Sequence, residues 1–87
     1  MKILAVCGLG QGTSLILRMN IEDVLRELGV DAEVDHMDVS AAAAEKADMI
    51  VASPQLAPLL AGHKAKVVVV NSYLNKAEIK KAIQENL

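Results

Sequence analysis

The sequence predicts a single α/β domain, residues 1–87, built on a four-stranded parallel sheet, and three observations support this. Four short apolar runs alternate with four segments of helical character along the chain. The runs at residues 3–6 and 49–52 are apolar throughout, as is typical of strands buried on both faces. The connections are short, which favours right-handed crossovers with helices on both faces. The second run is partly polar and belongs at an edge, so we predict strand order 2-1-3-4 in a Rossmann-like, three-layer open sandwich.

The first part of the chain contains two predicted strands with a long helix between them. The strand over residues 3–6 ends at Cys7, and a helix follows over residues 15–28, where apolar side chains recur at helical spacing. Gly29 is a typical helix stop. Residues 30–37 alternate in part between apolar and acidic side chains, which predicts a half-exposed edge strand.

The middle of the chain predicts a short helix and a central strand. Four consecutive alanines favour a helix over residues 41–47, with Asp38 or Ser40 as its cap. The apolar run at residues 49–52 predicts a strand with no exposed face, and residues 53–55 (Ser-Pro-Gln) end it.

The last part of the chain predicts one or two helical turns over residues 56–60, stopped by Gly62, and then a strand over residues 66–70 that contains four consecutive valines. Asn75 caps the final helix, with Glu78 three positions later in a variant of the capping box. The buried stripe of this helix consists of Ile79, Ala82, Ile83 and Leu87.

Composition excludes several classes of function. The formal net charge is −2, there is no Trp or Phe, and no basic stripe is present, so we expect no nucleic-acid binding. A single cysteine rules out an internal disulfide and any CxxC metal or redox pair, which indicates a reducing compartment. No stretch approaches the roughly 20 apolar residues of a membrane span, nor the apolar core of a signal peptide. We therefore expect a cytoplasmic protein without direct membrane insertion.

Cys7 and the glycine-rich stretch behind it carry the main functional signal. The first strand lies at the switch point of the predicted sheet, so Cys7 opens into the crevice at the carboxyl edge. Glycines at alternate positions can take positive φ and turn their N–H groups inward, where a thiolate or a phosphate dianion is stabilised. Thr13 and Ser14 are expected both to cap the helix and to contact phosphate. We interpret Cys7 as a residue that carries a phosphoryl group, with a phosphate-binding loop of Gly8, Leu9, Gly10, Gln11, Gly12, Thr13 and Ser14.

Other phosphate-binding loops fit less well. A nucleotide-binding P-loop has a lysine after its last glycine, and a dinucleotide fingerprint has a third small residue at position 13, where this chain has Thr13. A cysteine-dependent phosphatase would also place a clamping arginine at position 13, and Arg18 lies too far into the helix to replace it. A stand-alone phosphatase of the low-molecular-weight type and a non-catalytic anion-binding module remain as alternatives.

The segment CGLGQGTS, residues 7–14, resembles the active-site loop of the enzyme IIB component of bacterial sugar phosphotransferase systems. It is most similar to the ascorbate, galactitol and lactose types, and closest to the ascorbate-like pattern, and the length and the four strand–helix units also agree. The resemblance implies that Cys7 takes a phosphoryl group from a phosphohistidine on the IIA component and passes it to a sugar bound by the membrane component IIC. It implies no cofactor or metal, and a place beside a membrane transporter. Leu9 departs from the pattern, because relatives often carry a polar or small residue there.

Several other residues have competing interpretations. We interpret His36 as a solvated residue at a strand end rather than as a base for Cys7, and His63 as a surface residue at the opposite edge. The turns at residues 35–38, 53–55 and 71–73 are candidate walls of the site. Contributions of His36, Ser53, Gln55 and Asn71 stay open. An apolar rim for docking IIA and IIC, with core packing as the alternative for the methionines, consists of Leu9, Met19, Met37 and Leu56.

Overall fold

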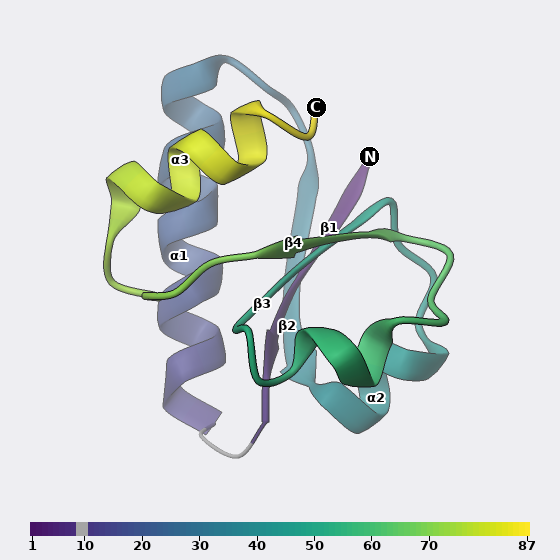
Figure 1. Cartoon of the computed structure of the whole chain (residues 1–87). Coiled ribbons are helices and arrows are strands. Elements are labelled where there is room, and N and C mark those ends of the chain that lie inside the picture. The colour runs from purple at the N-terminus through teal and green to yellow at the C-terminus, as the bar shows by residue number, and fades with distance from the viewer. Residues whose placement is uncertain (9–10) are drawn as a thin grey trace.

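Figure 1 shows the computed structural model, which describes the backbone of residues 1–8 and 11–87 and the side chains of residues 1–8 and 15–87. All the strands in this part of the chain are parallel, in the order β2-β1-β3-β4, which confirms the predicted topology. The elements are β1 (Lys2–Cys7), α1 (Gln11–Leu28), β2 (Glu33–Asp38), α2 (Val39–Ala44), β3 (Met49–Ala52), the 3-10 helix η1 (Ala57–Leu60), β4 (Lys66–Val69) and α3 (Lys76–Gln84).

The sheet separates two layers of helices, because successive side chains of a strand point to opposite faces. Ile3 and Ala5 face a core that α1 and α3 complete, whereas Leu4 and Val6 face a core that α2 and η1 complete. All four of these β1 residues have no exposed surface. The uniformly apolar runs that the sequence showed therefore mark strands enclosed on both faces.

The helix α1 begins at Gln11, one turn before the predicted start at Leu15. The apolar periodicity could not reveal this turn, because its residues 11–14 (Gln-Gly-Thr-Ser) include no large apolar side chain. At the other end Gly29 takes a φ of 70°, and Val30 N–H donates to the Leu25 carbonyl oxygen at 2.9 Å. This left-handed stop was predicted correctly.

The remaining boundaries shift by a few residues from the predicted ones. The strand β2 covers residues 33–38 rather than 30–37, and α2 covers 39–44 rather than 41–47. Asp38 is the cap of α2, because its Oδ1 accepts a hydrogen bond from Ala41 N–H at 2.8 Å. Asn75 likewise caps α3, with its Oδ1 accepting from Glu78 N–H at 3.1 Å. Both caps were among those that the sequence predicted.

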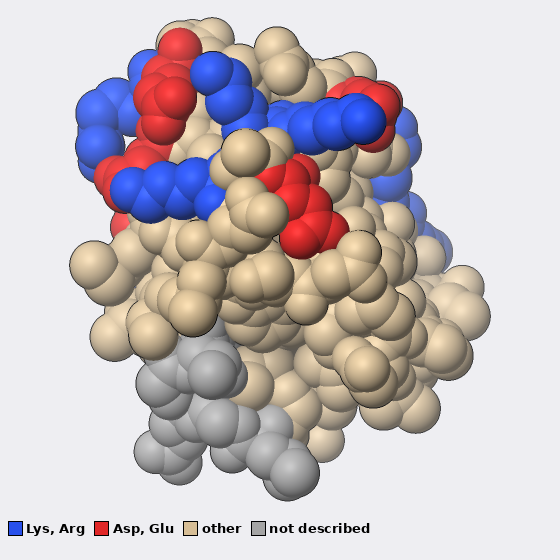
Figure 2. Space-filling model, turned by 60° about the vertical axis from the view of Figure 1, so that its left-hand side comes forward, with Lys and Arg blue, Asp and Glu red and all other residues tan. Residues whose placement is uncertain are grey.

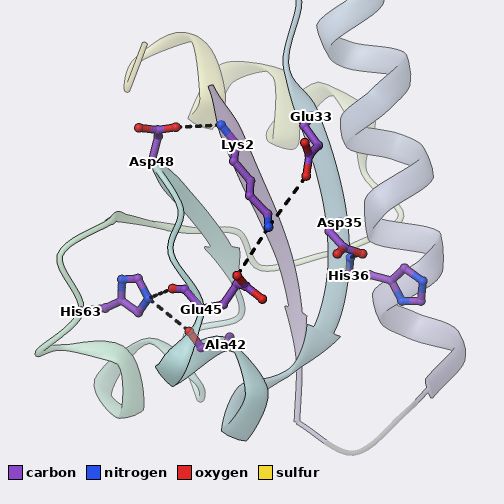
Figure 3. Close-up of polar contacts among 8 residues, drawn as sticks. All are labelled: Lys2, Glu33, Asp35, His36, Ala42, Glu45, Asp48 and His63. Carbon is purple, nitrogen blue, oxygen red and sulfur yellow. Dashed lines mark hydrogen bonds and ion pairs between the residues drawn. The ribbon is translucent and has the colours of Figure 1, made fainter.

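The amino edge of the sheet is held together by charged and polar contacts (Figure 3). The backbone N–H of Lys2 donates to Asp48 Oδ2 at 2.7 Å. The Lys2 ammonium lies 3.8 Å from a Glu33 oxygen and 3.5 Å from a Glu45 oxygen. These contacts join β1, β2 and the segment after α2 at the end of the sheet opposite Cys7.

Among the helices that the structure describes, none combines the length and the apolar character of a membrane-spanning segment.

Candidate functional site at the end of the first strand

Cys7 is the last residue of β1, at the carboxyl edge of the sheet. The chain leaves β1 through α1 to β2 on one side, and returns through α2 to β3 on the other. Cys7 therefore lies at the topological switch point, as the sequence predicted, where parallel α/β sheets open into a crevice. The residue is 7% exposed, so most of its surface is in contact with the protein.

The stretch after Cys7 differs in part from the predicted loop. Gly8 does not take the positive φ that the glycine pattern suggested. Its lack of a side chain has another reason here, because a Cβ at Gly8 would lie 3.0 Å from Leu56 Cδ2. Gly8 thus allows the segment before η1 to approach the end of β1 closely. Leu9 and Gly10 lie outside the described residues.

Residues 11–14 form the first turn of α1 rather than a loop before it. The prediction that Thr13 and Ser14 cap the helix is therefore wrong, since both lie inside its first turn. The first four N–H groups of an α-helix have no partner within the helix, and they point toward its amino end. Cys7 precedes this turn by four residues. The side chains of Gln11, Thr13 and Ser14 lie outside the described residues, and contacts from residues 8–14 to phosphate stay a prediction.

Tyr73 reaches the site from the loop between β4 and α3. Its hydroxyl donates a hydrogen bond to the Val6 carbonyl oxygen at 2.7 Å, directly before Cys7. The pKa of Tyr73 is raised, mainly because the phenol group is half-buried. Hydrogen bonding by Ser53 opposes this rise, and the negative charge of a Cys7 thiolate adds to it. The turns at residues 53–55 and 71–73 thus meet at the end of β1, as predicted, whereas residues 35–38, predicted as a third turn, belong to β2. The role of the hydroxyl was missed, although a sole tyrosine in the turn after the last strand was a usable signal.

Glu78 shapes the same loop from α3. Its carboxylate accepts hydrogen bonds from Asn71 N–H at 2.7 Å, from Asn71 Nδ2 at 3.0 Å and from Ser72 N–H at 3.1 Å. The backbone N–H of Asn71 is the main reason that the pKa of Glu78 is lowered. Glu78 therefore does not bond back to the cap residue as a capping box would, and instead ties the loop to the helix. Both the backbone N–H and the side-chain Nδ2 of Asn71 donate to Glu78.

The two histidines differ from the predictions in detail. His36 is half-buried inside β2, where its register partner is Ala5, and its ring extends toward α1 (Figure 3). It is thus not a solvated residue at a strand end. His63 lies at the amino edge as predicted, but it is half-buried rather than on the surface.

The His63 ring links α2 to the connection before β4. Its Nε2 lies 3.1 Å from the Ala42 carbonyl oxygen and 2.8 Å from that of Glu45, and its Nδ1 accepts from Ala65 N–H at 2.9 Å. The proton therefore lies on Nε2, which donates to the carbonyls. A groove of about 500 Å³ runs beside this ring, between α2 and residues 62–64. Both features belong to the amino edge, away from Cys7.

The predicted apolar rim divides between core and surface. Met37 and Leu56 are half-buried and pack against the α2-side core, whereas Met19 is 54% exposed. Leu15, Ile16 and Leu74 are also exposed. On the face shown in Figure 2, charged side chains gather in the upper part, and the surface between them and the grey residues is uncharged. An uncharged, partly apolar surface therefore lies near the amino half of α1.

The amino-acid sequence is similar to those of known proteins along almost its whole length. The chain matches the sequence model of the family "PTS system, Lactose/Cellobiose specific IIB subunit" over residues 2–85. It is 32% identical over 90 residues to the ascorbate-specific PTS system EIIB component of Mycoplasma pneumoniae, covering 100% of this chain and 95% of that one. It is 38% identical over 80 residues to the ascorbate-specific PTS system EIIB component of Shigella sonnei, covering 88% and 79%.

A solved structure agrees in fold. The lactose-specific IIB domain of the phosphoenolpyruvate:carbohydrate phosphotransferase system (PTS) from Streptococcus pneumoniae has a TM-score of 0.57, at 21% identity, over 99% of this chain and 93% of that chain. The match over residues 2–85 establishes that the chain belongs to the lactose/cellobiose-type family of PTS IIB subunits. The resemblance carried by residues 7–14 is thereby confirmed, and the chain is a component of a sugar phosphotransferase system.

Proposed function

We propose that the chain is a phosphocarrier that uses Cys7 to move a phosphoryl group from a IIA component to a sugar bound by a membrane IIC component. The observation that carries the proposal is the position of Cys7, the only cysteine, at the switch point of the sheet and four residues before the start of α1. A thiolate and a phosphate dianion are both favoured near the amino end of a helix. Membership of the IIB family supports the same role.

The proposed chemistry consists of two displacements at phosphorus. In the first, the Cys7 thiolate attacks in line, an S–P bond forms, and the P–N bond to the donor histidine breaks with its electron pair on the ring nitrogen. In the second, a sugar hydroxyl attacks the same phosphorus and gives up its proton to solvent, an O–P bond forms, and the S–P bond breaks with its electron pair on sulfur, which restores the thiolate. Backbone N–H groups of residues 8–14 would stabilise the charge in each transition state.

The sequence around Cys7 suits a reversible transfer. Residues 8–14 contain no lysine or arginine, so neutral amide groups would hold the phosphoryl group without a cationic clamp. This distinguishes the site from that of a phosphatase, which would stabilise the transition state for hydrolysis more strongly. We assign the choice of sugar to the IIC partner, and we propose that the chain works at the membrane only by docking to that partner.

The uncharged surface near the amino half of α1 supports docking of a protein partner close to Cys7. Leu15, Ile16 and Met19 are exposed there, on consecutive turns of one helix. Exposed apolar residues that cluster beside a reactive group are typical of a protein interface. The ion pairs between α1 and α3 lie further along the helix, at Asp23–Lys76 and Glu27–Lys80.

The test is phosphorylation by the complete relay. The chain is incubated with phosphoenolpyruvate, the general phosphotransferase proteins and a candidate IIA, and the labelled residue is mapped by mass spectrometry. We expect one phosphoryl group, on Cys7, and none in the Cys7→Ser variant. Label on another residue, or label that persists in Cys7→Ser, contradicts the proposal. Sustained turnover of a small aryl phosphate would instead indicate the phosphatase alternative.

A further inference from the structure

The carbonyl group directly before Cys7 accepts a hydrogen bond from a side chain. The register partners between β1 and β3 end at Ala5 and Val51, so Val6 lies one residue beyond the last pair on that side, whereas the pairing of β1 with β2 continues through Val6 and Cys7. The Val6 carbonyl oxygen accepts the hydrogen bond from the Tyr73 hydroxyl at 2.7 Å. Val6 has no exposed surface. Tyr73 therefore supplies a hydrogen-bond donor to a buried carbonyl group near the end of β1, directly before Cys7.

Tyr73 is itself held at both its backbone and its ring. Asn20, on α1, donates a hydrogen bond from Nδ2 to the Tyr73 carbonyl oxygen at 2.6 Å. The half-buried ring packs against the core on the α1 and α3 side of the sheet. Glu78 binds the backbone N–H groups of the two preceding residues. These contacts order the loop from three directions, so the hydroxyl has a fixed place.

The phenol group also lies within electrostatic range of the sulfur. The charge of a Cys7 thiolate contributes to the raised pKa of Tyr73, after the effect of burial. Hydrogen bonding by Ser53, the residue directly after β3, opposes the rise. Tyr73 thus connects the ends of β1 and β3 beside the reactive residue.

Building on the proposed function, we propose that Tyr73 is a positioning residue for phosphoryl transfer at Cys7, fixing the peptide group between Val6 and Cys7 in one orientation. The peptide is planar, so a fixed Val6 carbonyl also fixes the direction of the Cys7 N–H. The hydrogen bond keeps the negative end of the carbonyl dipole turned toward the tyrosine. A site held in this way loses less conformational freedom when the phosphoryl group arrives.

The first test compares Tyr73→Phe with a control of similar structural cost. Tyr73→Phe keeps the ring and removes only the donor. Ile83→Val removes one methyl group from the same core, near the end of α3, and leaves the hydroxyl in place. We expect Tyr73→Phe to lower kcat for phosphorylation by phospho-IIA about tenfold with KM nearly unchanged. Ile83→Val should keep the wild-type kcat at a temperature where both variants are folded.

Three outcomes of this test overturn the proposal. One is a wild-type rate in Tyr73→Phe. Another is an equal loss of rate in Ile83→Val, which would show that reduced stability alone explains the effect. A rise in KM with kcat unchanged would also contradict it, because the hydroxyl would then act in donor binding rather than in the transfer step.

The second test uses the tyrosine as its own reporter and needs no phosphodonor. Tyr73 is the only tyrosine and the chain has no tryptophan, so the ultraviolet titration of phenolate reports on this residue alone. Cys7→Ser removes the thiolate charge, and we expect the Tyr73 titration midpoint to fall toward its ordinary value. An unchanged midpoint overturns the electrostatic contact between the Tyr73 phenol group and the Cys7 thiolate. If the wild type accepts no phosphoryl group, the proposed function fails, and this titration still decides whether Tyr73 is set against Cys7.

Discussion

Gly8 offers a direct test of how closely the end of β1 and the segment before η1 approach each other. In Gly8→Ala the new Cβ would lie 3.0 Å from Leu56 Cδ2, whereas carbon atoms prefer about 3.5–4.0 Å. Leu56 is half-buried against the α2-side core, so it can turn aside only by giving up contacts there. Overpacking of this kind costs about 1–3 kcal/mol. Because the contact is with the flexible end of Leu56, we expect a cost near the lower limit of this range. Alanine also reduces the conformational entropy of the unfolded chain, which stabilises the fold by about 0.5 kcal/mol.

The net expectation for Gly8→Ala is a loss of about 1 kcal/mol in the free energy of unfolding. For a domain of this size, that corresponds to a fall of about 4–8 °C in Tm. In a Leu56→Ala background the clash is absent, so the same substitution should be neutral or slightly stabilising. Urea unfolding of the wild type, both single variants and the double variant measures the coupling. We expect a coupling energy of about 1 kcal/mol, with Leu56→Ala relieving the cost of Gly8→Ala.

Two other glycines are matched controls for the Gly8 cycle. Gly62 has no heavy atom within 4 Å of the position that a Cβ would occupy and no positive φ, so Gly62→Ala should stabilise by about 0.5 kcal/mol. Gly29 has the same open space but a φ of 70°, so Gly29→Ala should cost about 1 kcal/mol through backbone strain alone. The Leu56→Ala background should leave the effect of each of these two substitutions unchanged. Additive effects of Gly8→Ala and Leu56→Ala would refute the close approach.

Two further predictions concern the loop at the site and the far edge of the sheet. The pKa of Glu78 is lowered in the folded chain, so the carboxylate stabilises the fold above the unfolded-state pKa, and this contribution is lost as pH falls through the folded-state pKa. The difference in urea midpoint between wild type and Glu78→Gln should therefore be largest near neutral pH and vanish in acid, and a constant difference would contradict the assignment. His63→Ala removes the bridge between α2 and the connection before β4, and should cost about 1 kcal/mol of stability in thermal unfolding. Its phosphorylation rate should stay at the wild-type value, since the ring lies at the edge opposite Cys7, and a slowed transfer in a stable variant would argue against that separation.

The strand order could be predicted because burial leaves a direct trace in the sequence. Residues 3–6 and 49–52 are apolar at every position and are enclosed on both faces, whereas β2 alternates and lies at an edge. The caps Asp38 and Asn75 were also readable, since a short polar side chain before a helix has a specific local partner. The first turn of α1 could not be predicted in this way, because residues 11–14 in the sequence do not extend the apolar pattern from which helices are inferred.

The contacts that complete the site depend on distant parts of the chain, which local patterns do not report. Glu78 suggested a capping box by its spacing, yet its carboxylate binds the loop before the helix instead. Tyr73 and Val6 are 67 positions apart, and only the parallel topology brings them together. The same holds for His63, whose partners in α2 and directly after it lie 21 and 18 positions earlier. The sequence could indicate which edge such residues leave, but not which group each one would bind.

The enclosure of β1 has a consequence for the proposed transfer. Residues 3–6 are fully buried between two cores, and β1 has a neighbouring strand on each side, so the backbone that carries Cys7 is fixed before any donor arrives. The pairing of β1 with β2 continues to Cys7, whereas its pairing with β3 ends at Ala5, so on the β3 side the carbonyl group of Val6 lies beyond the last register pair. That is the group which the Tyr73 hydroxyl binds. A nucleophile that must accept a phosphoryl group from one protein and pass it to another benefits from a rigid backbone, because preorganisation lowers the barrier in both directions equally.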